Sequence, residues 1–393
     1  MAQTPALGET TSPHPRPESG RPFFGLIDNI LVGDPAEFDF DGALSGEQAE
    51  AVWTWMTRDL AADLLGKVTS PQSFEAVLPE VMVRFREIIT ALSDGQDMHR
   101  RLATQLGGEE IIPRLPVVYG AFKARALLEK AKGFGRAING MHDDASLAAA
   151  VQSLPFQDKA TAALLMQAMI GEISNPSRLV TAVIRIAGAS TDAAVTRAGF
   201  APVIDALLSH AQNQLPALVQ FGAFADVDLV CRAVDRFHRL MRAVNSYVEL
   251  SRNSRWAVVS AALTKKASER IEPRLRDVMA DVNQSLRHRE GNDRLESDRL
   301  LAALNGIYLL VAVRDARDSL ALNAAFDQIW TQIGQALELH TTRNLEVLRE
   351  NPANKITSAR LEAGIKMAEL RFNTEYADVL RRAREVAERR TES

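Results

Sequence analysis

The residues with the clearest potential for chemistry are His142, Asp143 and Asp144, which place an imidazole and two carboxylates at successive positions. Groups of this kind can bind a divalent metal ion. The surrounding sequence, Gly-Met-His-Asp-Asp-Ala-Ser-Leu, is also typical of a turn that enters a helix, where an aspartate accepts hydrogen bonds from free backbone N–H groups. We therefore expect an N-cap at this position and no metal site.

Two classes of all-helical enzyme use neighbouring acidic residues. Metal phosphohydrolases need a further histidine and a distant aspartate, and isoprenoid-type enzymes need a second carboxylate one turn after the first. Leu147 stands three residues after Asp144, where that second carboxylate is required. For the phosphohydrolase, His99 with Asp192 or Asp205 could supply the further groups, but the Gly-Lys that commonly follows the His-Asp pair is absent. No motif for either class is therefore complete, and a helical enzyme whose site is not visible as a motif stays an alternative.

Three other candidates for chemistry lie elsewhere in the chain. Asp235 and His238 have the spacing of half a di-iron site, but the Glu-x-x-His pair that such a site needs twice does not occur. Cys231, the single cysteine, lies beside an apolar stripe, which favours a thiol at the edge of the core. The Gly-Phe-Gly sequence at 133–135 lacks the third glycine of a dinucleotide-binding loop and is expected to break a helix. We predict no catalytic residue, no metal ligand and no cofactor.

Apolar residues at helical spacing indicate the elements that carry these side chains. Seven of them recur every three or four residues, a rhythm that places them on one helix face with charged residues between them. They are Val227, Val230, Val234, Phe237, Met241, Val244 and Val248. Similar patterns continue to the C-terminus, and we therefore predict an all-α protein.

Composition is compatible with a globular, soluble chain. Hydrophobic residues make up 46% and charged residues 24% of the sequence, and the formal net charge is only −4. This balance gives no reason to expect nucleic-acid binding, and the arginines of the last predicted helix alternate with acidic residues. The longest apolar run, 300–313, is too short to span a bilayer and predicts a core helix. We expect a cytoplasmic protein, and the excess of arginine over lysine indicates a bacterial source.

Proline and glycine divide the chain into three parts. Residues 1–22 are expected to form a disordered tail, residues 23–222 an irregular multi-helix domain, and residues 223–393 an antiparallel bundle of long helices. Start signals in the irregular domain include Ser45 with Gln48, which make a capping box. Ser70 and Asn175 each precede a proline and are expected to cap a helix. The long helices are predicted at 226–250, 254–290, 295–317, 320–350 and 355–389, with Pro273 expected to kink or split the second.

One apolar cluster stands between the predicted tail and an acidic stretch, 34–41. Its spacing suits a short helix that lies in a groove, either of this protein or of a partner. We predict that seven residues of the cluster and of the acidic stretch bind a partner. They are Phe23, Phe24, Ile27, Ile30, Leu31, Phe38 and Phe40. In the alternative, the segment packs on its own domain.

The leading functional hypothesis is a non-enzymatic helical scaffold or regulatory adaptor that binds protein partners. It depends on the abundance of amphipathic helix surface. Besides the helical enzyme, a second alternative is a peripheral membrane protein that uses the apolar cluster, 23–32, as an anchor. Pairing of two copies through one exposed helix stripe is a further possibility.

Overall fold

The computed structural model describes residues 20–32, 37–92, 95–219, 226–288 and 295–389. Within these residues it contains seventeen α-helices and one two-stranded sheet, so the all-α prediction is confirmed. The sheet consists of β1 (Leu31–Val32) and β2 (Leu44–Ser45), which pair in parallel. Most of the tail predicted for residues 1–22 lies outside the described residues, and helix α1 begins at Arg21.

The chain forms two compact units, which are described separately. The first contains the described residues of Met1–Pro216 together with Arg239–Ser260, and the second contains those of Ala217–His238 and Ala261–Ser393. The divisions fall inside two helices, α12 (Val227–Asn245) and α13 (Arg255–Leu286), so each of these helices belongs partly to both units. The domains proposed from the sequence, 23–222 and 223–393, stay a prediction.

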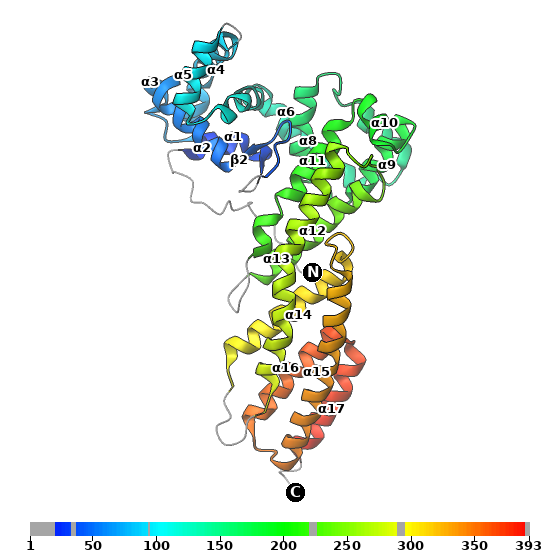
Figure 1. Cartoon of the computed structure of the whole chain (residues 1–393). Coiled ribbons are helices and arrows are strands. Elements are labelled where there is room, and N and C mark those ends of the chain that lie inside the picture. The colour runs from blue at the N-terminus through cyan, green and yellow to red at the C-terminus, as the bar shows by residue number, and fades with distance from the viewer. Residues whose placement is uncertain (1–19, 33–36, 93–94, 220–225, 289–294, 390–393) are drawn as a thin grey trace. The chain divides into compact units, whose positions relative to one another are not determined.

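Among its described residues, the first unit contains eleven complete α-helices, which range from 4 to 26 residues in length (Figure 1). They are α1 (Arg21–Ile27), α2 (Gly46–Trp55), α3 (Ala62–Leu65), α4 (Pro71–Ala91), α5 (Gln96–Leu106), α6 (Leu115–Gly140), α7 (Asp144–Gln152), α8 (Lys159–Ile170), α9 (Pro176–Ala187), α10 (Asp192–Arg197) and α11 (Ala201–Gln212). A 3₁₀ turn, η4 (Glu109–Arg114), precedes α6.

Local capping signals account for several of these helix starts. Ser45 and Gln48 form the predicted capping box at α2, and the Ser70 hydroxyl accepts a hydrogen bond from the backbone N–H of Ser73 at α4. Helix α9 begins at Pro176 as expected, but Asn175 makes no side-chain cap bond there. The predicted cap at Asn175 is therefore wrong, although the predicted start is confirmed.

Helix α6 continues through the Gly-Phe-Gly sequence at 133–135, so the predicted helix break is wrong. A Cβ atom on Gly135 would lie only 2.6 Å from the carbonyl oxygen of Met169 in α8. The glycine is thus required by the close approach of the two helix backbones. Tertiary packing compensates for the low helix propensity of glycine.

The second unit contains α14 (Ser297–Ala316), α15 (Asn323–Glu350), α16 (Lys355–Arg371) and α17 (Thr374–Arg389), with parts of α12 and α13. Helix α14 carries the apolar run 300–313 and buries Ile307, Leu310 and Val313, which confirms a core helix. Helix α13 passes through Pro273 without a break. The described part of the chain contains no helix with both the length and the apolar composition needed to cross a bilayer.

The single helix predicted at 355–389 is wrong, because α16 ends at Arg371 and α17 starts at Thr374. Asn373 separates the two helices, and its side-chain oxygen accepts a hydrogen bond from the backbone N–H of Tyr376 at 2.8 Å. Two helices are thus formed in place of one, and each packs against α15. The antiparallel bundle itself stays a prediction.

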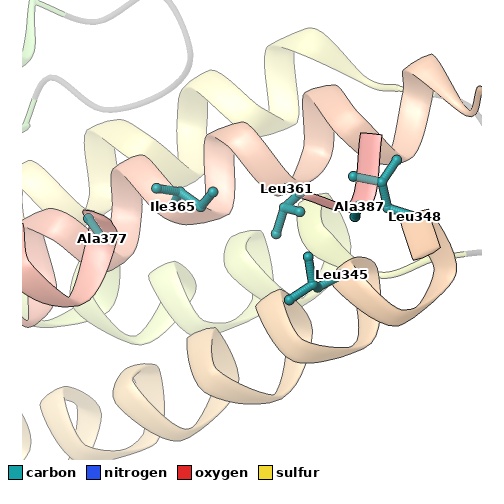
Figure 2. Close-up of a cluster of buried hydrophobic side chains, with 6 residues drawn as sticks. All are labelled: Leu345, Leu348, Leu361, Ile365, Ala377 and Ala387. Carbon is teal, nitrogen blue, oxygen red and sulfur yellow. The ribbon is translucent and has the colours of Figure 1, made fainter. Parts of the chain in front are cut away.

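Figure 2 shows the apolar cluster that joins α15, α16 and α17. Leu345 projects from α15 toward Leu361 of α16, and Leu348 and Ile365 belong to the same cluster. Helix α17 contributes Ala377 and Ala387, whose small side chains let it lie close to its neighbours. The buried face of α17 is therefore made mainly of alanine.

The apolar stripe predicted on 227–248 forms the buried face of α12 and of the residues that follow it. Val230, Val234 and Phe237 are at most 2% exposed, and Met241 and Val244 are fully buried. Three of the intervening arginines, Arg232, Arg239 and Arg242, are exposed, and Arg236 is half-buried. The prediction of the helix and of its buried face is confirmed.

Candidate functional site

The residues with the clearest potential for chemistry serve as a helix cap. The Asp143 carboxylate accepts hydrogen bonds from the backbone N–H and the hydroxyl of Ser146, both at 2.7 Å, which confirms the predicted N-cap of α7. These hydrogen bonds hold the pKa of Asp143 below its usual value. Asp144 forms an ion pair with Arg185 at 3.0 Å, and His142 is exposed. Among the described residues, no group of histidine, cysteine and acidic side chains is arranged to hold a metal ion.

The contacts of the other candidate residues, His238 and Cys231, also indicate structural roles. The ring Nδ1 of His238 lies 2.9 Å from the hydroxyl of Ser319, within the second unit. Burial, with the nearby charge of Asp228, raises the pKa of the Cys231 thiol to about 11. A thiol with that pKa is protonated at neutral pH and is a poor nucleophile.

Three arginines of α17, Arg381, Arg384 and Arg389, form ion pairs with acidic residues of α16 or of α17 itself, whereas Arg382 donates to the carbonyl oxygen of Asp378. Arg381 pairs with Asp378 at 2.7 Å and with Glu369, and Arg384 pairs with Glu388 at 3.0 Å. Their charges are thus compensated within the second unit. This arrangement agrees with the salt-bridged helix face expected from the sequence.

The predicted partner-binding cluster is divided by the structure into a buried part and a second, partly exposed part. Phe23, Phe24, Ile27 and Ile30 are at most 2% exposed, and Leu31 is half-buried in strand β1. The Phe23 ring stacks on Trp53 with centroids 5.2 Å apart. The four buried residues belong to the core of the first unit, so binding of a partner through them would require the segment to leave that core.

The second part is the segment 37–41, Glu-Phe-Asp-Phe-Asp, which we call the acidic segment. Its aromatic residues face the protein, because Phe40 is 2% exposed and Phe38 is half-buried. Its three acidic residues are exposed. The segment contains no α-helix or strand, and its main chain and the Asp39 carboxylate are instead bound by side chains of other elements. We call the set of those side chains, Gln48, Arg114, Gln167, Gln212 and Arg255, the cradle.

Gln212, the last residue of α11, binds the main chain of the acidic segment. Its Oε1 accepts hydrogen bonds from the N–H groups of Phe38 at 2.9 Å and of Glu37 at 3.2 Å. Its Nε2 donates to the carbonyl oxygen of Phe38 at 3.1 Å. The amide side chain, which is 1% exposed, thus bonds to Phe38 in the way that a neighbouring β-strand would.

Arg114 and Gln48 bind the carboxylate of Asp39. The Arg114 Nη2 atom lies 2.7 Å from one carboxylate oxygen, and Gln48 Nε2 donates to the other at 3.2 Å. The Arg114 side chain is only 11% exposed, and its Nε makes no hydrogen bond. A charge withdrawn this far from water needs an anionic partner, and Asp39 supplies it.

Arg255, at the start of α13, binds the same segment from another direction. It donates to the carbonyl oxygen of Asp39 at 2.6 Å, and its guanidinium lies 5.4 Å from the centre of the Phe40 ring. The buried carboxylate of Asp205 orients it at 3.0 Å and also accepts a hydrogen bond from the indole of Trp256 at 2.9 Å. Burial raises the pKa of Asp205, against the opposing effects of Trp256 and Arg255.

The end of the acidic segment is shaped by a tight turn against α8. The backbone N–H of Ala43 donates to the carbonyl oxygen of Phe40 at 3.2 Å, and Gly42 has a φ of +73°. A Cβ atom at Gly42 would lie 2.5 Å from the carbonyl carbon of Ala163 in α8. Gln167 of α8 also donates to the carbonyl oxygen of Asp41 at 3.4 Å.

These contacts can recognise a peptide, because they combine main-chain hydrogen bonds, a carboxylate partner and a buried aromatic ring. Sequence reasoning placed Phe38 and Phe40 in the site but missed the whole cradle. Gln212 and Arg255 follow their partners by more than 170 positions, and no local pattern marks them. The alternation of aromatic and acidic residues at 37–41 was the available signal, because it is the pattern of a chain with one buried side.

The fold and the site define an all-α protein that holds an acidic segment of its own chain in a polar cradle. No protein-family model matches the chain, and neither a curated protein nor a solved structure matches it.

Proposed function

We propose that this protein is a non-enzymatic scaffold or regulatory adaptor of the bacterial cytoplasm, and that the cradle is its site for protein partners. In this proposal the acidic segment occupies the cradle until a partner replaces it. Of the residues assigned to partner binding from the sequence, Phe38 and Phe40 therefore act at this site.

The observation that carries the proposal is the set of hydrogen bonds between Gln212 and the main chain of Phe38. A buried amide that bonds to both the N–H and the carbonyl of one residue recognises peptide backbone, whatever the side chain. The same bonds are open to a segment of another protein. Arg114 and Arg255 add two cationic groups that attract an acidic partner.

Affinity capture with the full-length protein tests the proposal. The cradle variant carries Arg114→Ala and Gln212→Ala, and the matched control carries Arg101→Ala and Gln152→Ala, two exposed positions of the same unit. We expect a partner that the wild type and the control capture and that the cradle variant loses by about tenfold or more. Asp39→Ala, which weakens the hold on the acidic segment, should increase its capture.

Capture that is equal for the wild type, the control and the cradle variant would contradict the proposal. Circular dichroism of each variant separates loss of binding from loss of fold. The membrane-anchor alternative makes a different prediction, because it requires the buried residues Phe23 and Phe24 to reach a lipid surface. Co-sedimentation with liposomes would then depend on those residues and not on Gln212.

A further inference from the structure

We infer that the cradle recognises an extended acidic peptide of the form Phe-Asp-Phe-x-Gly, and that residues 38–42 of this chain are an internal copy of that ligand. This inference rests on the proposed function of the cradle as a site for protein partners. It specifies the chemistry of the partner, which the proposed function leaves open. Each position of the motif follows from a separate contact.

Arg114 requires an aspartate at the second position of the motif. Its side chain is 11% exposed, whereas the Asp39 carboxylate that it binds is 60% exposed. The buried member of the pair belongs to the cradle and the accessible member to the ligand. A ligand without a carboxylate at this position would leave the guanidinium with an unpaired charge away from water, which is strongly unfavourable. The cradle should therefore discriminate sharply between aspartate and asparagine.

The buried site and the guanidinium of Arg255 require a phenylalanine at the third position of the motif. Phe40 is 2% exposed, and the guanidinium over its ring is oriented by the carboxylate of Asp205. An aliphatic side chain could fill part of the same space, but it has no π face for the cation. The first phenylalanine, Phe38, is half-buried, and its backbone is what Gln212 binds. We therefore expect the second aromatic position to be more selective than the first.

The glycine of the motif is set by the turn against α8. Gly42 combines a left-handed φ of +73° with a Cβ position that would overlap the backbone of Ala163 and Leu164. A side chain there cannot move aside, because the obstacle is main chain. A peptide with alanine at this position should therefore fail to make the turn that seats the preceding aromatic ring.

Because the internal copy occupies the cradle, an external peptide must compete with it for binding. A tethered segment is present at an effective concentration on the order of millimolar, so an external peptide must exceed it in affinity or find it weakened. Asp39→Ala weakens the internal copy and leaves all the cradle side chains in place. It should therefore increase binding of an external peptide that carries the aspartate.

The test uses a fluorescent peptide with the sequence of residues 37–43, Glu-Phe-Asp-Phe-Asp-Gly-Ala, titrated with the full-length protein by fluorescence anisotropy. We expect Asp39→Ala to bind it at least about tenfold more tightly than the wild type does. Adding Gln212→Ala to that variant should remove the gain. Peptides with Asn for the first Asp, Ala for the second Phe or Ala for Gly should each bind at least about tenfold more weakly.

Amide hydrogen exchange on the wild type gives a second measurement that needs no variant. Excess peptide should speed exchange at Glu37 and Phe38, whose N–H groups are bonded to Gln212 in the closed state. The inference is overturned if a folded Asp39→Ala protein binds the peptide no better than the wild type, or if the altered peptides bind equally. Partner capture that depends on Gln212 without any peptide binding would overturn this inference and leave the proposed function standing.

Discussion

At the scale of single residues, some polar side chains cap helices and others join segments that are distant in the sequence. Asp143 caps α7, whereas Gln212 joins the end of α11 to a segment 174 positions earlier. Gly42 has a third role, because it allows the main chain to turn where α8 leaves no room for a Cβ atom. Such roles can be tested by small substitutions.

Replacement of Gly42 by alanine should destabilise the first unit more than replacement of Gly188. Both glycines have a left-handed φ, +73° and +76°, but a Cβ at Gly188 would meet nothing within 4 Å. We expect a loss of about 1 kcal/mol for Gly188→Ala from the backbone conformation. For Gly42→Ala we expect about 2–4 kcal/mol, because overpacking adds to this strain. Urea unfolding followed by circular dichroism measures both, and equal losses would contradict the close approach to α8.

Cys231 should react slowly with thiol reagents at neutral pH. Burial raises its pKa to about 11, so the reactive thiolate is a very small fraction of the thiol at pH 7. We expect alkylation by iodoacetamide to be at least about tenfold slower than in urea-unfolded protein under the same conditions. Mass spectrometry gives both rates. Reaction of the folded protein as fast as the unfolded chain would show an accessible thiol with an ordinary pKa and would contradict the prediction.

At the scale of elements, side chains near helix ends tie one helix of the second unit to another. Asn344 of α15 donates to the carbonyl oxygen of Leu286, the last residue of α13, at 2.9 Å. One turn earlier, His340 Nε2 lies 2.9 Å from the Asn283 side-chain oxygen. Burial lowers the pKa of His340, and the neighbouring charges of Arg343 and Arg287 lower it further. The hydrogen bond between His340 of α15 and Asn283 of α13 is therefore expected to be sensitive to pH.

The second unit should lose stability as the pH falls through the ordinary histidine range. The unfolded chain binds a proton at His340 near pH 6.5, whereas the folded protein resists that proton to a lower pH. Protons bound preferentially by the unfolded state lower the free energy of unfolding, so stability should decline as the pH falls below about 6.5 and toward the lower pKa of the folded protein. His340→Gln should reduce this slope, because it removes the group whose pKa differs between the folded and unfolded protein. An unaltered slope in His340→Gln, measured by urea unfolding, would contradict the prediction.

At the scale of the whole molecule, two helices are shared between the two compact units. The first unit holds Arg239–Ser260, which includes the end of α12 and the start of α13, and the second holds the remainder of both helices. A helix is a cooperative structure, so loss of one half disfavours the other. We therefore expect a destabilising substitution in the core of one unit to lower the stability of the other unit as well.

Phe237→Ala should destabilise both units. Phe237 is fully buried on the part of α12 that belongs to the second unit, and truncation of a buried phenylalanine costs about 3–5 kcal/mol. Hydrogen exchange should become faster in α15 of the second unit and also in α11 of the first. Arg232→Ala, at an exposed position of the same helix segment, should change stability by no more than about 0.5 kcal/mol. Faster exchange in the second unit alone would show that the shared helices do not couple the two.

The sequence by itself determined the features that depend on neighbours within about one helical turn. The all-α class, the apolar face of α12, the capping box at Ser45 and the cap at Asp143 all follow from such short spacings. The break between α16 and α17 was missed, although Asn373 provides a local capping group. That error shows that a weak stop signal is overlooked inside a long apolar pattern.

Only the tertiary structure decided which segments meet. It placed Phe23 and Phe24 in the core, kept α6 continuous through Gly135 because α8 passes close by, and assembled the cradle around the acidic segment. Gln212 and Phe38 have no local relation in the sequence, and many glutamines could have made the same bonds. The packing of α11 in the first unit brings the two residues together. A hydrogen bond depends on the positions of its two groups in space, so no periodic pattern in the sequence marks it.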